Sequence, residues 1–343
     1  MQLSLELDVL ELLKNRRNLL AFSGGVDSSA LFFLLVEAGV EFDIAIVDYA
    51  LRKQSKDELS YAKDLAKNYK KLLYTYEAPK FTQNFEAKAR EIRYSFFEKL
   101  IDEHGYENLL TAHHLGDRLE WFFMQLSKGA GLLELLGMQL VEQKTDYKLI
   151  RPLLGVAKSE LLEYLHTIEK NYFIDETNTD EKYKRNYFRH NFSEPLLKEF
   201  LGGIKRSFSY LDSDKNILLD KNLEVENIGD FAYVRCSSFS REAVFAVDKY
   251  LKTKGYMLSF SEKQSLKSTK TLQVGRRFIL TLYVDKFIFI APYVEQKVVL
   301  DKVFKEECRV LKIDPAIRGF LYLNRGVFLS LKELLSKDIR SSK

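Results

Sequence analysis

The sequence contains few cysteines, tryptophans and prolines, and the scarcity of cysteine is the most informative of these. Its 343 residues include two cysteines, Cys236 and Cys308, together with one tryptophan and five prolines. The cysteines lie far apart and form neither a Cys-x-x-Cys pair nor a disulfide framework, which excludes a zinc-finger or disulfide-stapled fold. A reducing, cytoplasmic compartment fits this cysteine content best.

Long apolar runs and a strong charge of one sign are also missing. No stretch of roughly 18 apolar residues occurs, so we expect no membrane span. The N-terminus carries acids before bases, the reverse of a secretory signal, and is typical of an amphipathic helix. The net charge of +4 permits an anionic partner without requiring one. What remains is an ordinary globular composition, 46% hydrophobic and 30% charged, in a chain long enough for two domains.

The most informative stretch lies between two apolar segments near the N-terminus. Residues 19–22 are predicted to form a buried strand, and residues 30–38 a helix that Gly39 closes. The segment between them reads Ser23-Gly24-Gly25-Val26-Asp27-Ser28-Ser29. Glycines let a ligand approach the main chain, and the amides at the start of a helix attract anions. This segment is therefore predicted to bind phosphate.

The loop differs from the commoner phosphate-binding motifs, because it is neither G-x-x-x-x-G-K-[ST] nor G-x-G-x-x-G. Asp27 would repel a phosphate unless its carboxylate faces a Mg²⁺ that the phosphate holds. A purely structural strand-Gly-Gly-helix turn is the alternative. The whole septet, however, resembles the pyrophosphate loop of the N-type ATP pyrophosphatases, the PP-loop family, which adenylate a carbonyl-type oxygen and release pyrophosphate.

Strands and helices alternate through the first third of the chain. Further strands are predicted at 42–47, 71–76 and 108–112, and helices at 56–67, 85–102 and 117–126. Such alternation indicates an α/β fold with a doubly wound parallel sheet and ligands at the carboxyl ends of its strands. Polar residues do follow the predicted strands, namely Asp48, Arg52, His113, Asp117 and Glu120.

Each of these polar groups also has an ordinary explanation. Asp117 and Glu120 would share a helix face, but acids at a helix N-terminus often serve only as caps. His113 and His114 could be packed or solvated, and no third zinc ligand has suitable spacing. Residues 182–190 interleave basic and aromatic side chains, which suits RNA but is also typical of a solvated surface.

Taken in order, the motifs of roughly the first 190 residues resemble those of the tRNA(Ile)-lysidine synthetases. The matching segments are the loop 23–29, Val47-Asp48 with Leu51-Arg52, Ala89-Arg90 with Arg93-Tyr94, Ala112-His113-His114 with Asp117 and Glu120, Gly129-Ala130-Gly131, Arg151-Pro152-Leu153-Leu154, Asp175 with Asn178, and Arg185-Asn186 with Arg189. The chain departs from the family's usual His-Gly at Tyr49-Ala50, its usual acid at Gly116, and its usual Gln and Thr at Arg118 and Trp121.

The resemblance implies an adenine nucleotide alpha hydrolase-like sheet and an ATP-dependent carbon–nitrogen ligase. Such an enzyme adenylates C2 of the wobble cytidine in the CAU anticodon of tRNA(Ile), and free L-lysine then displaces AMP. The product, lysidine, changes the tRNA from methionine to isoleucine specificity. ATP and Mg²⁺ are the implied cofactors. The oligomeric state stays open, with a homodimer among the options.

The resemblance also implies roles for individual residues. ATP would be bound by Ser23, Gly24, Gly25, Val26, Asp27, Ser28 and Ser29, with Asp27 as the metal ligand. The expected catalytic residues are Asp27, His113, Asp117 and Glu120. One of the two carboxylates at 117 and 120 would orient the lysine amine and accept its proton. Contacts with tRNA or phosphate are expected from Arg90, Arg93, Arg151, Lys184, Arg185 and Arg189.

We expect three parts along the chain: a PP-loop ATP-pyrophosphatase catalytic domain at 1–195, a helical connector at 196–224, and a C-terminal α+β tRNA-binding domain at 225–343. In the last part, strands are predicted at 231–236, 277–284, 286–291 and 298–303, and residues 249–270 are rich in lysine. A structural or dimer-forming role is the alternative for this part.

Two other functions remain open at this point. Another PP-loop tRNA-modifying enzyme, such as a cytidine thiolase, would share the fold, but thiolases carry Cys-x-x-Cys pairs that this chain lacks. A non-catalytic RNA-binding relic would retain the fold without the chemistry. The intact loop residues Ser23, Gly24, Gly25, Asp27 and Ser28 argue against such a relic.

Overall fold

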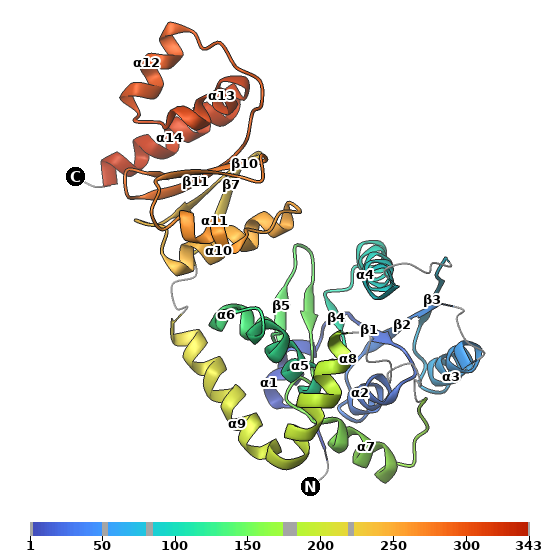
Figure 1. Cartoon of the computed structure of the whole chain (residues 1–343). Helices are drawn as coiled ribbons and strands as arrows, with labels where there is room; N and C mark the ends of the chain where they lie inside the picture. The colour runs from blue at the N-terminus through green and yellow to red at the C-terminus, as the bar shows by residue number, and fades with distance from the viewer. Residues whose placement is uncertain (1–2, 50–53, 80–84, 174–183, 219–222, 342–343) are drawn as a thin grey trace. The chain divides into compact units, whose positions relative to one another are not determined.

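A computed structural model describes residues 3–49, 54–79, 85–173, 184–218 and 223–341 (Figure 1). The predicted site residues Arg52, Asp175 and Asn178 lie outside these ranges. The chain divides into two compact units, Met1–Lys215 and Asn216–Lys343. Within the described ranges, no helix is long and apolar enough to cross a membrane.

The first unit is built on a six-stranded sheet with the order β3-β2-β1-β4-β6-β5. Its strands are β1 Asn18–Phe22, β2 Phe42–Asp48, β3 Leu73–Glu77, β4 Asn108–Leu110, β5 Val141–Gln143 and β6 Lys148–Ile150. All neighbours pair in parallel except β5, which runs antiparallel to β6. The doubly wound parallel sheet predicted from the sequence is confirmed. The predicted fourth strand is shorter than expected, and β5 and β6 were missed because three residues carry too little periodicity.

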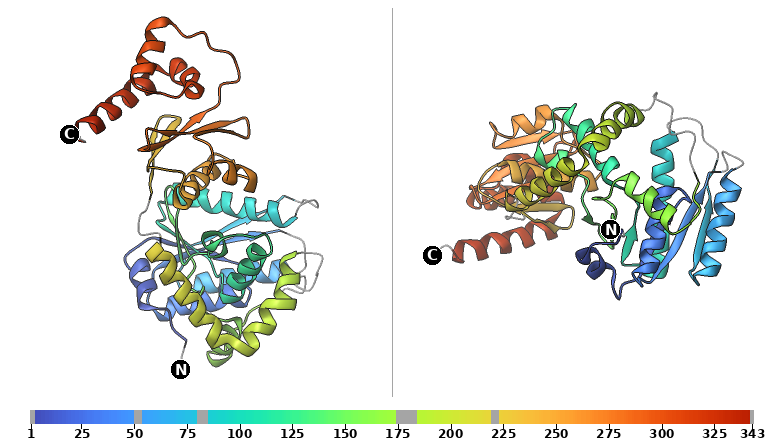
Figure 2. Two further views of the ribbon diagram at one scale, coloured as in Figure 1. Left: turned by 60° about the vertical axis from the view of Figure 1, so that its left-hand side comes forward. Right: turned by 90° about the horizontal axis from the view of Figure 1, so that it is seen from below.

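Helices cover both faces of this sheet (Figures 1 and 2). The helices of this unit are α1 Leu7–Leu13, α2 Val26–Glu37, α3 Gln54–Asn68, α4 Phe85–His104, α5 Leu115–Leu126, α6 Leu132–Leu135, α7 Lys158–Thr167, α8 Lys184–Phe188, the π-helical turn Arg189–Ser193, and α9 Glu194–Leu218. Of these, α6 and α9 pack against α5. Alternate strand residues face opposite sides. Leu20 and Phe22 pack with α1, α2, α3 and α7, whereas Leu19 packs with α4.

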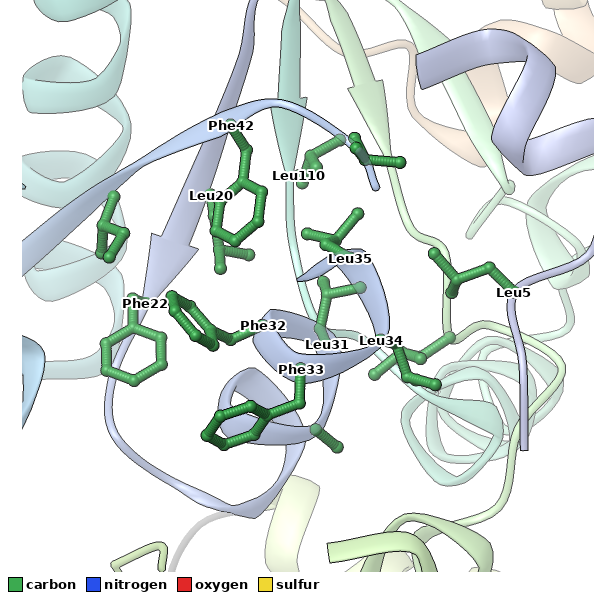
Figure 3. Close-up of a cluster of buried hydrophobic side chains, with 14 of the residues drawn as sticks. Leu5, Leu20, Phe22, Leu31, Phe32, Phe33, Leu34, Leu35, Phe42 and Leu110 are labelled. Carbon is green, nitrogen blue, oxygen red and sulfur yellow. The ribbon is translucent and has the colours of Figure 1, made fainter. Parts of the chain in front are cut away.

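The larger core lies under α2, where Phe32 is fully buried (Figure 3). Its ring centroid lies 5.3 Å from that of Phe42 and 6.1 Å from that of Phe22, and both pairs meet edge to face. Nine of the twelve residues of α2 are buried, so this helix is held along most of its circumference. The loop that precedes it therefore joins two rigid elements.

The order of the strands decides where the first and fourth loops lie. β1 pairs with β2 on one side and with β4 on the other. The chain thus leaves β1 toward one edge of the sheet and later returns to β4 on its opposite side. Ligands of doubly wound sheets bind at such a switch point, outside the carboxyl ends of the two central strands. Residues 23–29 and 111–120 therefore meet there.

The second unit is an antiparallel sheet between two helical layers. Its order is β7-β8-β11-β10-β9, with β7 Val225–Ile228, β8 Phe231–Arg235, β9 Thr271–Val274, β10 Phe278–Tyr283 and β11 Phe287–Pro292. One face packs with α10 Arg241–Thr253 and the short helix α11 Phe260–Ser265. The other face packs with α12 Lys302–Val310, α13 Pro315–Leu323 and α14 Arg325–Ser341.

The strand predicted at 298–303 is wrong. These residues lead into α12, and the Asp301 carboxylate accepts a hydrogen bond of 2.7 Å from the Phe304 amide as the helix N-cap. The apolar run there resembles a strand, but the capping aspartate decides the structure. The predicted connector corresponds mostly to α9, which begins at Glu194 and reaches across the boundary between the two units. The three-domain division itself stays a prediction.

Candidate active site

The loop after β1 has a preformed backbone. Gly24 has a φ of +76°, and its carbonyl accepts a hydrogen bond of 2.9 Å from the Phe173 amide. A Cβ added to Gly24 would lie 3.3 Å from the Phe173 ring, so both conformation and space favour glycine. Gly25 is the N-cap of α2, whose first-turn amides have no acceptor within the helix. The loop thus has the anion-binding geometry predicted from the sequence.

The serines of this loop divide into two groups. Ser28 and Ser29 are buried, and their hydroxyls donate to the carbonyls of Gly25 and Gly24, each at 3.3 Å. The Ser28 hydroxyl also accepts from the Ser23 amide at 3.2 Å. Ser23 is exposed at the mouth of the loop. The buried serines therefore hold the shape of the loop, and Ser23 is the hydroxyl that a ligand can reach.

His114 connects this loop to the loop after β4. It is the N-cap of α5, where its Nδ1 accepts from the Gly116 amide at 2.9 Å and its own amide donates to Asp117 at 2.9 Å. Because Nδ1 is an acceptor, the hydrogen of the neutral ring lies on Nε2. That atom lies 3.8 Å from Asp27 and 3.7 Å from Asp117. His114 was not among the predicted catalytic residues, although the paired histidines were a signal for it.

His113, which was predicted to be catalytic, faces another partner. Its Nδ1 lies 2.9 Å from the Thr111 hydroxyl. Burial lowers the pKa of His113 to about 4, although the Asp117 carboxylate acts to raise it. The imidazole is therefore neutral near pH 7. In the described part of the chain, no contact of His113 places it between Asp27 and Asp117, which is the position that His114 occupies.

The unusual Gly116 has a physical explanation in the position of His114. A Cβ added at Gly116 would lie 2.6 Å from Cε1 of the His114 ring and 3.0 Å from its Nδ1. The imidazole thus fills the space that an acidic side chain would need. Any side chain at position 116 must displace His114 from the helix cap.

The two carboxylates of α5 are paired with Arg185 of α8 and with Arg189 of the π-helical turn. Glu120 accepts from Arg185 Nε at 2.8 Å and from Arg189 Nε at 2.6 Å, and Asp117 accepts from Arg185 Nη2. Burial alone would raise the pKa of Asp117, but the nearby His114 and Arg185 hold it well below its ordinary value. Asp117 is therefore a stable anion and a poor proton acceptor. Four of the predicted site residues thus meet in one cluster, namely Asp117, Glu120, Arg185 and Arg189.

Over the ranges that the structure describes, the carboxylate of Asp27 lacks a hydrogen bond at one of its oxygens. Its Oδ1 is buried and has no hydrogen-bond partner among the described residues. Burial raises the pKa of Asp27, against the opposing effect of His114. In the described part of the chain, no three His, Cys, Asp or Glu side chains gather as a complete metal site. A Mg²⁺ at Asp27 would need phosphate oxygens as further ligands, which is how this ion commonly binds nucleotides.

The other predicted basic residues lie in different environments. Arg90 and Arg93 are exposed on α4, where the Arg90 guanidinium lies 4.6 Å from the Tyr94 ring centroid. Lys184 is exposed at the start of α8. Arg151 is only 5% exposed. Its guanidinium donates to the Gln139 carbonyl at 2.7 Å and to the Glu142 carboxylate at 2.9 Å. Arg151 therefore stabilises the β5–β6 region.

Arg118, another departure from the family pattern, ties α5 to α9. Its Nη2 lies 2.6 Å from each carboxylate oxygen of Asp212, and its guanidinium lies 4.3 Å from the Phe208 ring centroid. A glutamine could not form this ion pair. The arginine thus fixes the helix that carries Asp117 and Glu120.

The switch-point location, the anion-binding loop and the adjoining carboxylates define the chain as an ATP-binding α/β protein of the PP-loop class. Residues 2–196 match the family described as "PP-loop domain". The chain is 44% identical over 316 residues to the tRNA(Ile)-lysidine synthase of Campylobacter jejuni subsp. jejuni, covering 92% of this chain and 95% of that protein. It is 44% identical to the Helicobacter pylori (strain 26695) synthase, covering 91% of each chain, and 41% identical to that of Wolinella succinogenes, covering 93% and 97%. The chain belongs to the tRNA(Ile)-lysidine synthase family.

We expect Gly116→Ala to displace His114 and to lower the free energy of unfolding of the first unit by about 1–2 kcal/mol, through loss of the helix cap and steric strain. Trp121, the single tryptophan, lies on the same helix and reports urea unfolding by fluorescence. Gly203→Ala is the matched control, because a Cβ there meets nothing within 4 Å. Equal destabilisation by both variants would contradict the role of His114.

Proposed function

We propose that this protein forms lysidine: it uses ATP to adenylate C2 of the wobble cytidine of CAU-anticodon tRNA(Ile) and then joins free L-lysine to that carbon. The observation that carries the proposal is the contact of His114 with both Asp27 and Asp117. Through His114, the predicted phosphate-binding loop lies next to the carboxylates of Asp117 and Glu120, which are suited to bind an amine. The family relationship supports the same activity.

In the first step, the cytidine O2 attacks the α-phosphorus of ATP and pyrophosphate leaves. The amides at the start of α2 and the Ser23 hydroxyl hold the departing phosphates. Positioning and charge neutralisation supply most of the catalysis in such transfers. When bound at Asp27, Mg²⁺ would neutralise phosphate charge, and the unpartnered buried Oδ1 fits that role.

In the second step, the lysine ε-amine attacks C2 of the adenylated base, and AMP leaves. A free lysine amine has a pKa of about 10.4 and must lose a proton before it attacks. The low pKa of Asp117 makes it an anchor for the cation rather than its base. Glu120, beside Asp117 on α5, is the second carboxylate of the pair that the amine would face.

The C-terminal unit is proposed to bind the body of the tRNA, and the reaction is placed in the cytoplasm, where tRNA, ATP and free lysine occur together. Lysines are frequent at 249–270, and cations of this kind bind phosphate backbones. A homodimer is compatible with this assignment and is not needed for it.

The decisive test of the function is pyrophosphate release with CAU-anticodon tRNA, Mg·ATP and each amino acid in turn. We expect release of pyrophosphate and AMP, with covalent incorporation into tRNA for L-lysine alone. tRNA(Met) serves as the control substrate, since it shares the anticodon. Incorporation of sulfur, or no turnover with any amino acid, would favour another PP-loop enzyme or an inactive relic.

Asp117→Asn and Glu120→Gln should each reduce lysine incorporation by about tenfold to a hundredfold, because an amide cannot compensate the ammonium charge. ATP affinity should change less than threefold in either variant. Both quantities are measured by lysidine formation and by nucleotide titration. Asp102→Asn, which changes an exposed acid on α4, is the control. Wild-type lysine kinetics in both variants would refute the assignment.

Removal of residues 225–343 should weaken tRNA binding by at least about tenfold, because phosphate contacts add strongly to affinity. Filter binding or mobility shift measures this loss. Trp121 fluorescence checks that the first unit, a compact body of its own, remains folded. An unchanged dissociation constant in a folded truncated protein would leave the C-terminal unit with a structural or dimer-forming role.

A further inference from the structure

The carboxylate pair that would receive the lysine amine is already occupied by cations of this chain. Arg185 bonds both Asp117 and Glu120, and Arg189 bonds Glu120 at 2.6 Å and lies 3.8 Å from Asp117. The side chains of Asp117 and Glu120 are 9% and 2% exposed, so water contributes little to their solvation. Compensation therefore comes from the two arginines and, for Asp117, also from His114.

The charges of this cluster balance. The two carboxylates and the two guanidinium groups sum to zero, so these four side chains offer no net negative charge to an entering lysine ammonium. Burying an ammonium without a counter-charge is costly. One arginine must leave before the pair attracts a free amine.

The geometry indicates which arginine can leave. The Arg185 side chain is 34% exposed, whereas that of Arg189 is 16% exposed. Departure of Arg185 would keep the Arg189–Glu120 pair and free Asp117 as a single anion, because Arg189 lies 3.8 Å from Asp117 but 2.6 Å from Glu120. One net negative charge then matches one ammonium.

We propose that Arg185 closes the amine site by occupying it, and that a phosphate group of bound tRNA or ATP opens the site by taking the Arg185 guanidinium. A guanidinium pairs with a phosphate through two parallel hydrogen bonds, as it does with a carboxylate. Arg185 would therefore exchange its carboxylate partners for an equivalent phosphate partner. This inference rests on the proposed function, since it assigns the amine to the Asp117–Glu120 pair. It makes lysine binding dependent on an anion bound beforehand.

Isothermal titration of the full chain with L-lysine, without RNA or nucleotide, tests the closed state. Arg185→Gln should bind lysine at least about tenfold more tightly than the wild type, because the competing cation is gone. Arg185→Lys keeps the charge and should stay closed. Lys198→Gln removes an exposed positive charge on α9 and should bind as the wild type does. Equal or weaker lysine binding by Arg185→Gln would overturn the proposal.

Addition of tRNA alone or of Mg·ATP alone to the wild type separates the two sources of phosphate. The addition that raises lysine affinity identifies the group that takes Arg185, and this arm needs no variant to fold. The proposal would be overturned if lysine affinity were the same without additions, with tRNA alone, with Mg·ATP alone and with both. This holds even when lysidine is formed. Failure of the wild type to incorporate lysine with both present would instead refute the proposed function.

Discussion

The whole site depends on the reversal of strand order at β1. Since β2 and β4 flank β1 on opposite sides, the loops after β1 and β4 must meet at the carboxyl edge of the sheet. The first loop has amides and a buried acid, and the second has a histidine cap and the carboxylates of α5. The first loop presents anion-binding amides, and the second presents carboxylates. In the proposed function, their meeting brings the activated base and the amine within reach of each other.

Burial of charge imposes the next constraint. Asp117 and Glu120 are buried at the start of α5, which packs against α9, and unpaired carboxylates there would be strongly destabilising. His114, Arg185 and Arg189 supply the compensation. His114 and Arg185 also hold the pKa of Asp117 low, so stability and protonation state are linked through these contacts. Under the proposed exchange, Asp117 becomes available to an amine when Arg185 leaves it.

Two departures from the family pattern fit the structure as coupled features. Gly116 leaves the space that the His114 ring fills, and Arg118 pairs with Asp212 across the α5–α9 contact. Glycine is required at position 116 because His114 fills the adjacent space, and Arg118 is neutralised because Asp212 faces it. Helix α5 is thus held at its cap by His114 and along its side by Asp212, and both contacts position the carboxylates between them.

Local patterns in the chain were enough for the parallel sheet, most helix positions and the turn at Gly24 and Gly25, because these follow from periodicity and glycine placement. Motif order also brought Asp27, Asp117 and Glu120 forward as candidates, and their roles stay predictions. The strand expected at 298–303, the Asp301 cap and the short β5 and β6 show the limit of such patterns. Which histidine connects the loops, the inward placement of Arg151, and the pairing of Arg185 with the carboxylates depend on contacts between residues tens of positions apart. Those contacts are set by packing and by the cost of burying charge, and neither is visible in neighbouring residues along the chain.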